Sequence, residues 1–417
     1  MAQSWHKLDN MGTFYSLTNK VIVPAVFRFS VTLSEDIDEE VLNAAIREAT
    51  KLYPIFKSHL RVGMFWYYLE TSDKEVKCTK EETPICERLY YDSTSDLFRV
   101  NYYHNRINLE VSHIISDGRG SLTFFKCLIY KYLIIKYNLK DIDIEDDSSI
   151  FEKAEDSFDK HYESNSEKKV NGSKGKIYHF SSKTKNNTTY MEYHISTSKA
   201  LELAHKYNTS LTGLILSVLV MSFKNEMKDR ELKDKCIKIN VPVDLRKYYN
   251  SKTSGNFFGL ASISYKFKSN NDTFEEVVES VNRELKEKLK IGNLQARMNL
   301  MISIEKNAIL RFISIFIKDF ILKVVDLMGD SNATTTVSNI GVIEVDPRLE
   351  KYIKGFNVFN TTGSMKFIVS SYKDDLSITI SSKYRNNDVI KNFCRYFGDN
   401  GIEGVLNTTK EDKYEEM

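Results

Sequence analysis

A polar stretch near the middle of the chain, residues 140–176, constrains the fold most, because it separates two halves that carry regular apolar patterns. It is acidic from Asp141 to Asp147 and then polar with two glycines, and no helical or strand period persists across it. Such composition is typical of a linker. A chain of 417 residues is also longer than one hydrophobic core normally supports. We therefore predict domains at 1–165 and 177–417, with 166–176 as the linker.

Strands and helices alternate in both halves, which predicts mixed α/β domains. In each half the coarse order is strand, helix, strands, helix. The first half is expected to contain strands within Val21–Leu33, Ile55–Leu60, Phe65–Glu70, Leu97–His104 and Ile107–Ile115, and helices over Val41–Leu52 and Leu122–Tyr137. The second half is expected to contain strands at Thr188–Ile195, Ile237–Val243, Leu260–Phe267, Thr334–Ser338, Phe356–Asn360, Phe367–Tyr372 and Leu376–Ser382, and helices at Thr197–Tyr207, Leu211–Met227 and Thr273–Lys290.

Composition argues against several classes of protein. Lys and Arg total 59 and Asp and Glu total 57, so the net charge of +2 gives no support to nucleic-acid binding. The five cysteines are scattered and include no Cys-x-x-Cys pair, which argues against a zinc site and fits a reducing compartment. The N-terminus shows no apolar core of the signal-peptide kind. We expect a cytoplasmic monomer with no transmembrane segment; the apolar stretch Ile309–Leu327 fits either a core helix or a membrane-surface helix.

The segment that most suggests chemistry lies where the predicted strand Ile107–Ile115 gives way to a helix. It presents His113, then Asp117 and Gly118, and a Gly-x-Gly break follows. An imidazole titrates near neutral pH, and loops fixed by rigid elements often carry functional sites. The structural alternative is that His113 only ends the strand and that Asp117 only caps the helix. The spacing alone does not decide between these interpretations.

Two further blocks follow in order along the chain. They are Pro242-Val-Asp-Leu-Arg246 with Asn256-Phe-Phe-Gly259, and Ser338-Asn-Ile-Gly341. Together with the His-x-x-x-Asp-Gly motif, they resemble the chloramphenicol-acetyltransferase-like superfamily, which includes condensation domains of nonribosomal peptide synthetases. The opening Lys7-Leu-Asp9 is most similar to the alcohol acetyltransferase branch. The resemblance spans most of the chain and implies two mixed α/β domains that form a pseudo-dimer around a central tunnel.

The sequence also departs from some branches of this superfamily. Condensation domains usually carry two adjacent histidines, whereas here the residue before His113 is Ser112. The Asp-Phe-Gly-Trp-Gly block of the plant branch is absent, and the comparable region reads Asn360-Thr-Thr-Gly-Ser-Met365. The sequence is expected to function without a fused carrier or adenylation domain. These departures favour a CoA-bound acyl donor over a carrier-bound one.

The resemblance implies a role for each residue of the motif. His113 would be the general base that takes a proton from the acceptor, and Gly118 would keep the donor passage open. Asp117 would point away from substrate and form a structural ion pair with Arg246. For Arg246 the alternative is a local pair with Asp244, two residues earlier.

Three other residues are candidate substrate contacts in the tunnel: Asn256, Ser338 and Asn339. The alternative for each is an ordinary turn residue beside a strand. The implied activity is transfer of an acyl group from acyl-CoA, as a co-substrate, to a small alcohol or amine, with the alcohol favoured. No permanently bound cofactor or metal is expected. The remaining alternatives are a donor on a separate acyl carrier protein and a non-catalytic binding relative.

Overall fold

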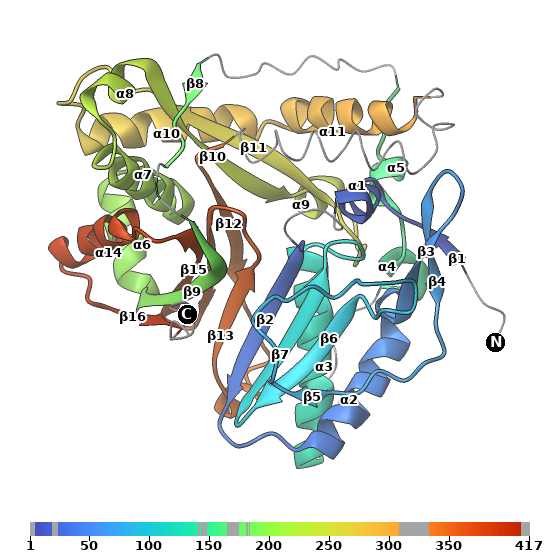
Figure 1. Cartoon of the computed structure of the whole chain (residues 1–417). Coiled ribbons are helices and arrows are strands. Elements are labelled where there is room, and N and C mark those ends of the chain that lie inside the picture. The colour runs from blue at the N-terminus through green and yellow to red at the C-terminus, as the bar shows by residue number, and fades with distance from the viewer. Residues whose placement is uncertain are drawn as a thin grey trace, which may run out of the picture.

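The computed structural model describes residues 5–18, 24–140, 142, 148–164, 175–180, 182, 184–307 and 333–409. Residues 166–174 of the predicted linker and the apolar stretch Ile309–Leu327 lie outside these residues. The described chain forms three sheets that build two lobes (Figure 1). The predicted class of mixed α/β layers is confirmed.

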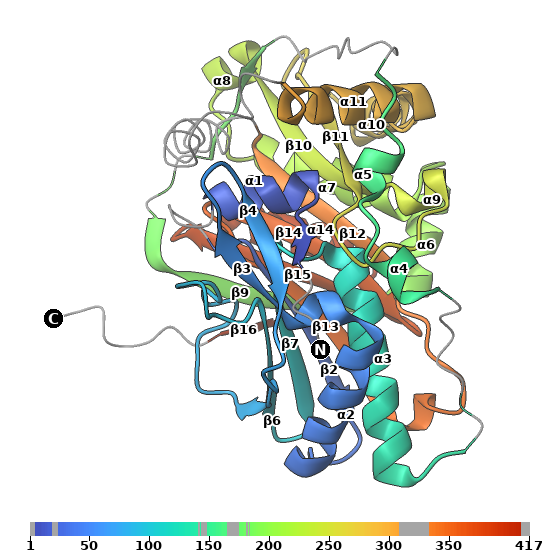
Figure 2. The ribbon, with the colours of Figure 1, turned by 90° about the vertical axis from the view of Figure 1, so that its right-hand side faces the viewer.

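The first lobe is built on a five-stranded sheet with the strand order β13-β2-β7-β6-β5. The strands are β2 (Val26–Leu33), β5 (Thr79–Lys80), β6 (Phe98–Tyr103), β7 (Arg106–Ser112) and β13 (Ile353–Asn360). Helices α2 (Glu39–Leu52) and α3 (Gly118–Tyr137) lie side by side and cover one face of this sheet (Figure 2). Apolar side chains from the sheet and both helices share one buried core, which holds α3 against the sheet.

Strand β13 comes from the second half of the sequence but belongs to the sheet of the first lobe. It pairs antiparallel with β2 over its whole length. Ile343 and Leu349, which precede it, are buried in the core of the first lobe. The division into 1–165 and 177–417 stays a prediction. Strand β13 differs from it, because this strand lies in 177–417 but pairs with a strand of 1–165.

The second lobe is built on an eight-stranded sheet with the order β11-β10-β12-β14-β15-β9-β16, and β8 pairs with β10 beside this path. The strands are β8 (Lys176–Ile177), β9 (Thr184–Ser196), β10 (Lys235–Asp244), β11 (Phe258–Tyr265), β12 (Thr335–Val342), β14 (Met365–Tyr372), β15 (Asp375–Tyr384) and β16 (Gly404–Thr408). The main helices are α6 (Thr197–Lys206), α7 (Leu211–Lys224), α10 (Phe274–Lys288), α11 (Ile291–Glu305) and α14 (Asp388–Asp399). Residues 214–220 of α7 are all buried, so the predicted core helix is confirmed.

A smaller sheet joins the N-terminal segment to the first lobe. Its strands are β1 (Trp5–Lys7), β3 (Ser58–Val62) and β4 (Tyr67–Thr71), in the order β1-β4-β3. Helix α1 (Asn10–Thr18) follows β1 and lies between the lobes: Met11 packs against the core of the second lobe, and Leu17 is buried in the core of the first.

One predicted strand is partly wrong. The stretch Ile55–Leu60 begins as a 3-10 turn (Pro54–Lys57), and β3 starts only at Ser58. The physical reason is Pro54, whose fixed φ suits the first position of a helical turn and whose missing N–H suits no central strand. The pattern of apolar residues alone did not reveal this.

Candidate active site

The His-x-x-x-Asp-Gly motif occupies the connection between β7 and α3. The predicted strand ends earlier than expected, at Ser112, because His113 to Ile115 form a turn in which the N–H of Ile115 donates to the carbonyl of Ser112 (3.1 Å). The N–H of His113 donates to the carbonyl of Ala25, just before β2 (2.8 Å). The backbone of His113 is therefore held by the segment that leads into β2.

Three aromatic rings surround the His113 imidazole. Tyr15 of α1 stacks on it with ring centroids 4.3 Å apart, Phe27 of β2 lies 4.1 Å away, and Phe258 of β11 lies 5.9 Å away. The residue is partly buried. Withdrawal of the ring from water lowers the pKa of His113 to about 4, which the hydrogen bond with Asn256 and the charge of Asp117 only partly oppose. The imidazole is therefore neutral at physiological pH.

Asn256 joins this histidine to the second lobe. Its side-chain Oδ1 lies 3.3 Å from Nδ1 of His113, and its Nδ2 donates to the carbonyl oxygen of His113 (3.0 Å). The residue is 1% exposed, so the amide has little room to turn. Among the described residues, no hydrogen-bond partner lies at Nε2 of His113, which leaves that nitrogen available to a substrate.

Asp117 is the N-cap of α3 and makes no described hydrogen bond to His113. Its Oδ1 accepts from the N–H groups of Arg119 and Gly120, at 3.1 and 2.9 Å. Its Oδ2 accepts from Nη1 of Arg246 (2.9 Å) and from the N–H of Phe257 (2.7 Å). The carboxylate is therefore fully hydrogen-bonded to its own helix and to the other lobe.

The guanidinium of Arg246 is equally occupied. Nη1 also contacts Oδ1 of Asp244 (3.2 Å), while Nε and Nη2 donate to the carbonyls of Thr253 (2.9 Å) and Gly255 (2.7 Å). Both pairings considered for Arg246 thus exist together. These contacts hold the loop 253–257, which carries Asn256, against the start of α3.

Glycines allow the two lobes to approach at the motif. A Cβ on Gly120 would lie 2.2 Å from the carbonyl oxygen of Ser254, so no larger residue fits there. A Cβ on Gly118 would lie 3.2 Å from Cδ1 of Ile340, on β12. The Gly-x-Gly break therefore provides room for backbone contacts between α3 and the second lobe.

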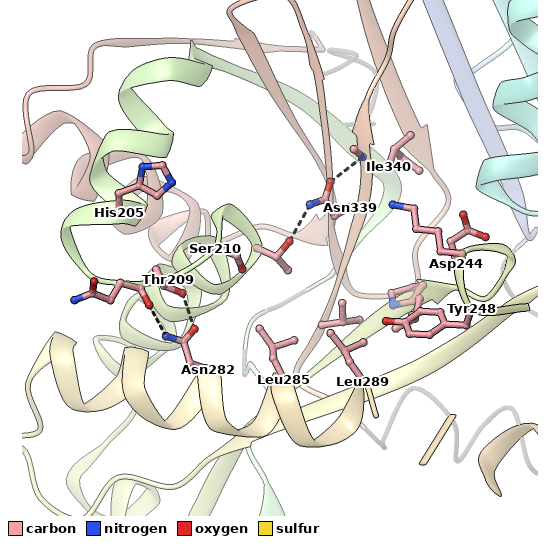
Figure 3. Close-up of a pocket in the computed structure, with 17 residues that line it drawn as sticks. His205, Thr209, Ser210, Asp244, Tyr248, Asn282, Leu285, Leu289, Asn339 and Ile340 are labelled. Atoms are coloured by element: carbon pink, nitrogen blue, oxygen red, sulfur yellow. Dashed lines mark hydrogen bonds between the residues drawn. The ribbon is translucent and has the colours of Figure 1, made fainter. Parts of the chain in front are cut away.

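A cavity of about 830 Å³ lies next to this contact, in the second lobe (Figure 3). Asn339 lines it, donates from Nδ2 to Oγ1 of Thr212 (2.9 Å), and accepts from the N–H of Gly341 (2.8 Å). Ile340, which faces Gly118, is part of the same wall. The other lining residues come from α6 and the turn after it, the start of α7, the end of β10, the short helix α9 (Arg246–Tyr249), α10 with the residue after it, and β12: His205, Asn208, Thr209, Ser210, Thr212, Val241, Pro242, Val243, Asp244, Lys247, Tyr248, Asn282, Leu285, Leu289 and Gly341.

The structure brings most of the predicted residues together. His113, Asp117, Gly118, Arg246 and Asn256 meet where the lobes touch, and Asn339 lies in the adjacent cavity. Ser338 is not among the residues that line this cavity.

Sequence reasoning missed Tyr15 and Phe27 as neighbours of the histidine, and it cited Asp9 only for the resemblance. None of these residues has a local pattern that points to the site, because each reaches it through the tertiary fold. Within the described ranges, no group of three or more His, Cys, Asp or Glu could hold a metal ion. Nor does any helix in those ranges combine the length and the apolar character needed to cross a bilayer.

Comparisons with known proteins bear on the fold. No protein-family model and no curated protein matches the sequence. Among solved structures, polyketide synthase associated protein 5 from Mycobacterium tuberculosis is 12% identical with a TM-score of 0.64, over 95% of this chain and 98% of that chain. The trichothecene 15-O-acetyltransferase TRI3 from Fusarium sporotrichioides is 11% identical with a TM-score of 0.63, over 94% of both chains. TRI101 of F. sporotrichioides, complexed with coenzyme A and T-2, is 11% identical with a TM-score of 0.63, over 94% of this chain and 97% of that one.

Condensation and epimerization domains of peptide synthetases share this architecture as well. The protein therefore has the two-lobed chloramphenicol-acetyltransferase-like fold that the motifs implied. At these identities the similarity establishes the fold, and the activity has to be argued from the site.

Replacing Asp117 by Asn should destabilise the protein by about 3 kcal/mol, because Arg246 and the N–H groups around it lose a buried carboxylate. Urea denaturation of both proteins measures this difference. The matched control is Glu48→Gln, which removes an exposed pair with Lys51 and should cost at most ~1 kcal/mol. An unchanged free energy of unfolding for Asp117→Asn would show that the ion pair with Arg246 does not form.

The stability of the protein should fall as the pH is lowered through the range in which an exposed histidine titrates. The unfolded imidazole takes up its proton near pH ~6.5, whereas the folded His113 has a pKa of about 4. Between these values only the unfolded state is protonated, so acid favours unfolding. Urea denaturation at about pH 7.5 and about pH 5 should show that the wild type loses more stability than His113→Gln. Equal losses would contradict the neutral, buried imidazole.

Proposed function

We propose that this protein is an acyltransferase that moves an acyl group from acyl-CoA to a small acceptor, with a hydroxyl favoured over an amine. The observation that carries the proposal is the state of His113: a neutral imidazole at the junction of the lobes, with Nδ1 held by Asn256 and Nε2 free of described partners. A neutral nitrogen with an available lone pair is what a general base requires.

In the proposed reaction the acceptor O–H gives its proton to Nε2 of His113 while the oxygen attacks the thioester carbonyl carbon. The tetrahedral oxyanion then re-forms the carbonyl and breaks the C–S bond. The departing thiolate takes the proton from Nε2, which regenerates the neutral imidazole and leaves an ester and free CoA. Proton transfer of this kind contributes ~10²–10⁴-fold, and holding the two substrates in register contributes more.

The contacts of Asp117 support a structural role for it in this mechanism. Both of its oxygens are occupied by α3, Arg246 and Phe257, and it makes no described hydrogen bond to His113. Its charge acts on the imidazole at a distance only, where it raises the pKa against the larger effect of burial. Asp117 therefore holds the scaffold in place, and the proton passes through His113.

The cavity beside Ile340 is the proposed site for the CoA donor. Its volume of about 830 Å³ lies within the range of small-molecule sites. The start of α7, at Ser210, opens into it, and Lys247 lies on its wall. A helix N-terminus and a lysine both favour phosphate groups, which CoA carries. The TRI101 structure with the same fold is complexed with coenzyme A, which supports this choice of donor.

The acceptor is proposed to be a hydroxyl compound. TRI3, which shares the fold, is named as a 15-O-acetyltransferase. The alternative donor is an acyl group on a carrier protein, because such a carrier presents the same thioester and condensation domains share the fold. The two donors differ outside the reacting atoms, so the chemistry at His113 is the same for both.

Replacing His113 by Ala should lower acyl transfer by ~10²–10⁴-fold, because the base is lost, and should leave the fold intact. The assay is release of free thiol from a panel of acyl-CoAs with alcohol and amine acceptors, together with a thermal melt. His104→Asn is the control, since His104 lies in an exposed turn at the other end of the hairpin and has φ of 49°, which Asn tolerates.

Equal turnover of acyl-CoA by wild type and His113→Ala would refute the catalytic assignment. Turnover of only a carrier-bound acyl group, still dependent on His113, would correct the donor and leave the chemistry standing.

Replacing Lys247 by Glu should raise the KM for acyl-CoA about three- to tenfold, with little change in kcat, because the lysine is proposed to contact the phosphates and not the thioester. Initial rates at varied acyl-CoA measure this effect. Lys354→Glu makes the same charge change at an exposed position of β13, away from the cavity, and should leave the KM unchanged. Equal KM values for the two variants would place the donor elsewhere.

A further inference from the structure

The N-terminal segment supplies a carboxylate to the site from outside the motifs. The backbone N–H of Asn256 donates to Oδ2 of Asp9 (2.9 Å), and Nδ2 of Asn256 lies 3.2 and 3.1 Å from the two oxygens. The N–H of Gly12 donates to Oδ1 (2.6 Å). The Asp9 carboxyl oxygens thus accept hydrogen bonds from Gly12 and Asn256. Asn256 in turn contacts His113, so it links Asp9 to the imidazole.

These contacts fix which way the Asn256 amide faces. Its NH₂ group is directed to the oxygens of Asp9, which only accept hydrogen bonds when the carboxyl is ionised, and to the carbonyl oxygen of His113, which only accepts. The reverse orientation would place the amide oxygen against the carboxylate and would be repelled. Therefore Oδ1 is the atom that faces Nδ1 of His113.

The orientation of the amide in turn selects the tautomer of the histidine. An amide oxygen can only accept, so Nδ1 has to carry the hydrogen of the neutral ring. The lone pair is then on Nε2, the nitrogen without a described partner. Loss of the carboxylate would leave only the carbonyl oxygen of His113 to hold the NH₂ group, so the reversed amide would become more populated. Its NH₂ would then favour the opposite tautomer, which has no lone pair at Nε2.

Asp9 also controls what covers the face of the ring. It is the residue before α1, and its bond from Gly12 caps that helix. Helix α1 carries Tyr15, whose ring stacks on His113 at an interplanar angle of 22°. A Cβ on Gly12 would lie 2.6 Å from the carbonyl oxygen of Ile114, so α1 sits directly on the motif turn. One carboxylate thus orders both the edge and the face of the imidazole.

We propose that Asp9 is a positioning residue for His113: through Asn256 it sets the tautomer with hydrogen on Nδ1, and through α1 it holds Tyr15 against the ring. This inference rests on the proposed function for its catalytic consequence, but the tautomer itself is a property of the protein without substrate.

The test is ¹⁵N NMR of the protein labelled on its histidine rings, with the His113 signals identified from their absence in His113→Ala. Wild type should show hydrogen on Nδ1, and Asp9→Asn should shift the ring toward the other tautomer. In the transfer assay, Asp9→Asn should lower kcat by about 10- to 100-fold, less than loss of the base itself, and should leave the KM for acyl-CoA unchanged. Asp9→Glu, which restores a carboxylate, should recover part of both the tautomer and kcat.

The matched control is Asp38→Asn, since Asp38 is an exposed carboxylate that caps α2 and makes no described contact with Asp9, Asn256 or His113. It should change neither the ring signals nor kcat. Asp9→Glu also keeps the test valid if Asp9→Asn fails to fold.

Ring signals that stay the same in Asp9→Asn would overturn the proposal, whatever happens to kcat. If the tautomer shifts as expected but wild type transfers no acyl group, the positioning role stands and the proposed function fails.

Discussion

The rest of the site depends on the hydrogen bonds of the buried Asp117 carboxylate. It ends the motif turn by capping α3, and with its other oxygen it binds Arg246 and Phe257 of the second lobe. A buried ion pair contributes little net stability, because desolvation offsets the Coulombic attraction. Its value here is geometric: all four hydrogen-bond sites of the carboxylate are filled from two lobes, so only one relative placement satisfies it. The position of His113, four residues earlier, follows from that placement.

Burial then determines the protonation of the groups that this placement brings together. It lowers the pKa of His113 to about 4 and raises the pKa of Asp9 to about 7, although Gly12 and Asn256 donate hydrogen bonds that favour the charged carboxylate. The signs of the linkage are opposite. His113 lowers the stability of the fold as the pH falls below the pKa of an exposed imidazole. Asp9 lowers it as the pH rises toward 7. The fold therefore buries an Asp9 side chain whose pKa is close to neutral pH near a His113 ring that stays uncharged.

The sequence was sufficient for the motif and for most elements, because strand alternation, helix caps and the Gly-x-Gly break are local signals. Through the resemblance it also paired Asp117 with Arg246, but it named Asn256 as a substrate contact and did not predict its hydrogen bonds to His113. It could not reveal that β13 joins the first sheet, since a pattern of apolar residues does not say which strand is the neighbour. Nor could it reveal Tyr15, whose ring reaches His113 from a different element. Ser338 and Asn339 were treated alike, but only Asn339 lines the cavity.

The same contacts explain why such a site has to be assembled from both lobes. In the proposed reaction two substrates meet at Nε2 of His113 and need separate approaches, which a side chain enclosed by a single lobe would not provide. Here the first lobe supplies the imidazole on the turn after β7, and the second lobe supplies the amide that orients it and the cavity next to it. Gly118 and Ile340 are in contact at the point where the cavity wall meets the motif. A side chain at 118 would require the end of Ile340 to shift, so this glycine links the wall of the cavity proposed for the donor to the turn that carries His113.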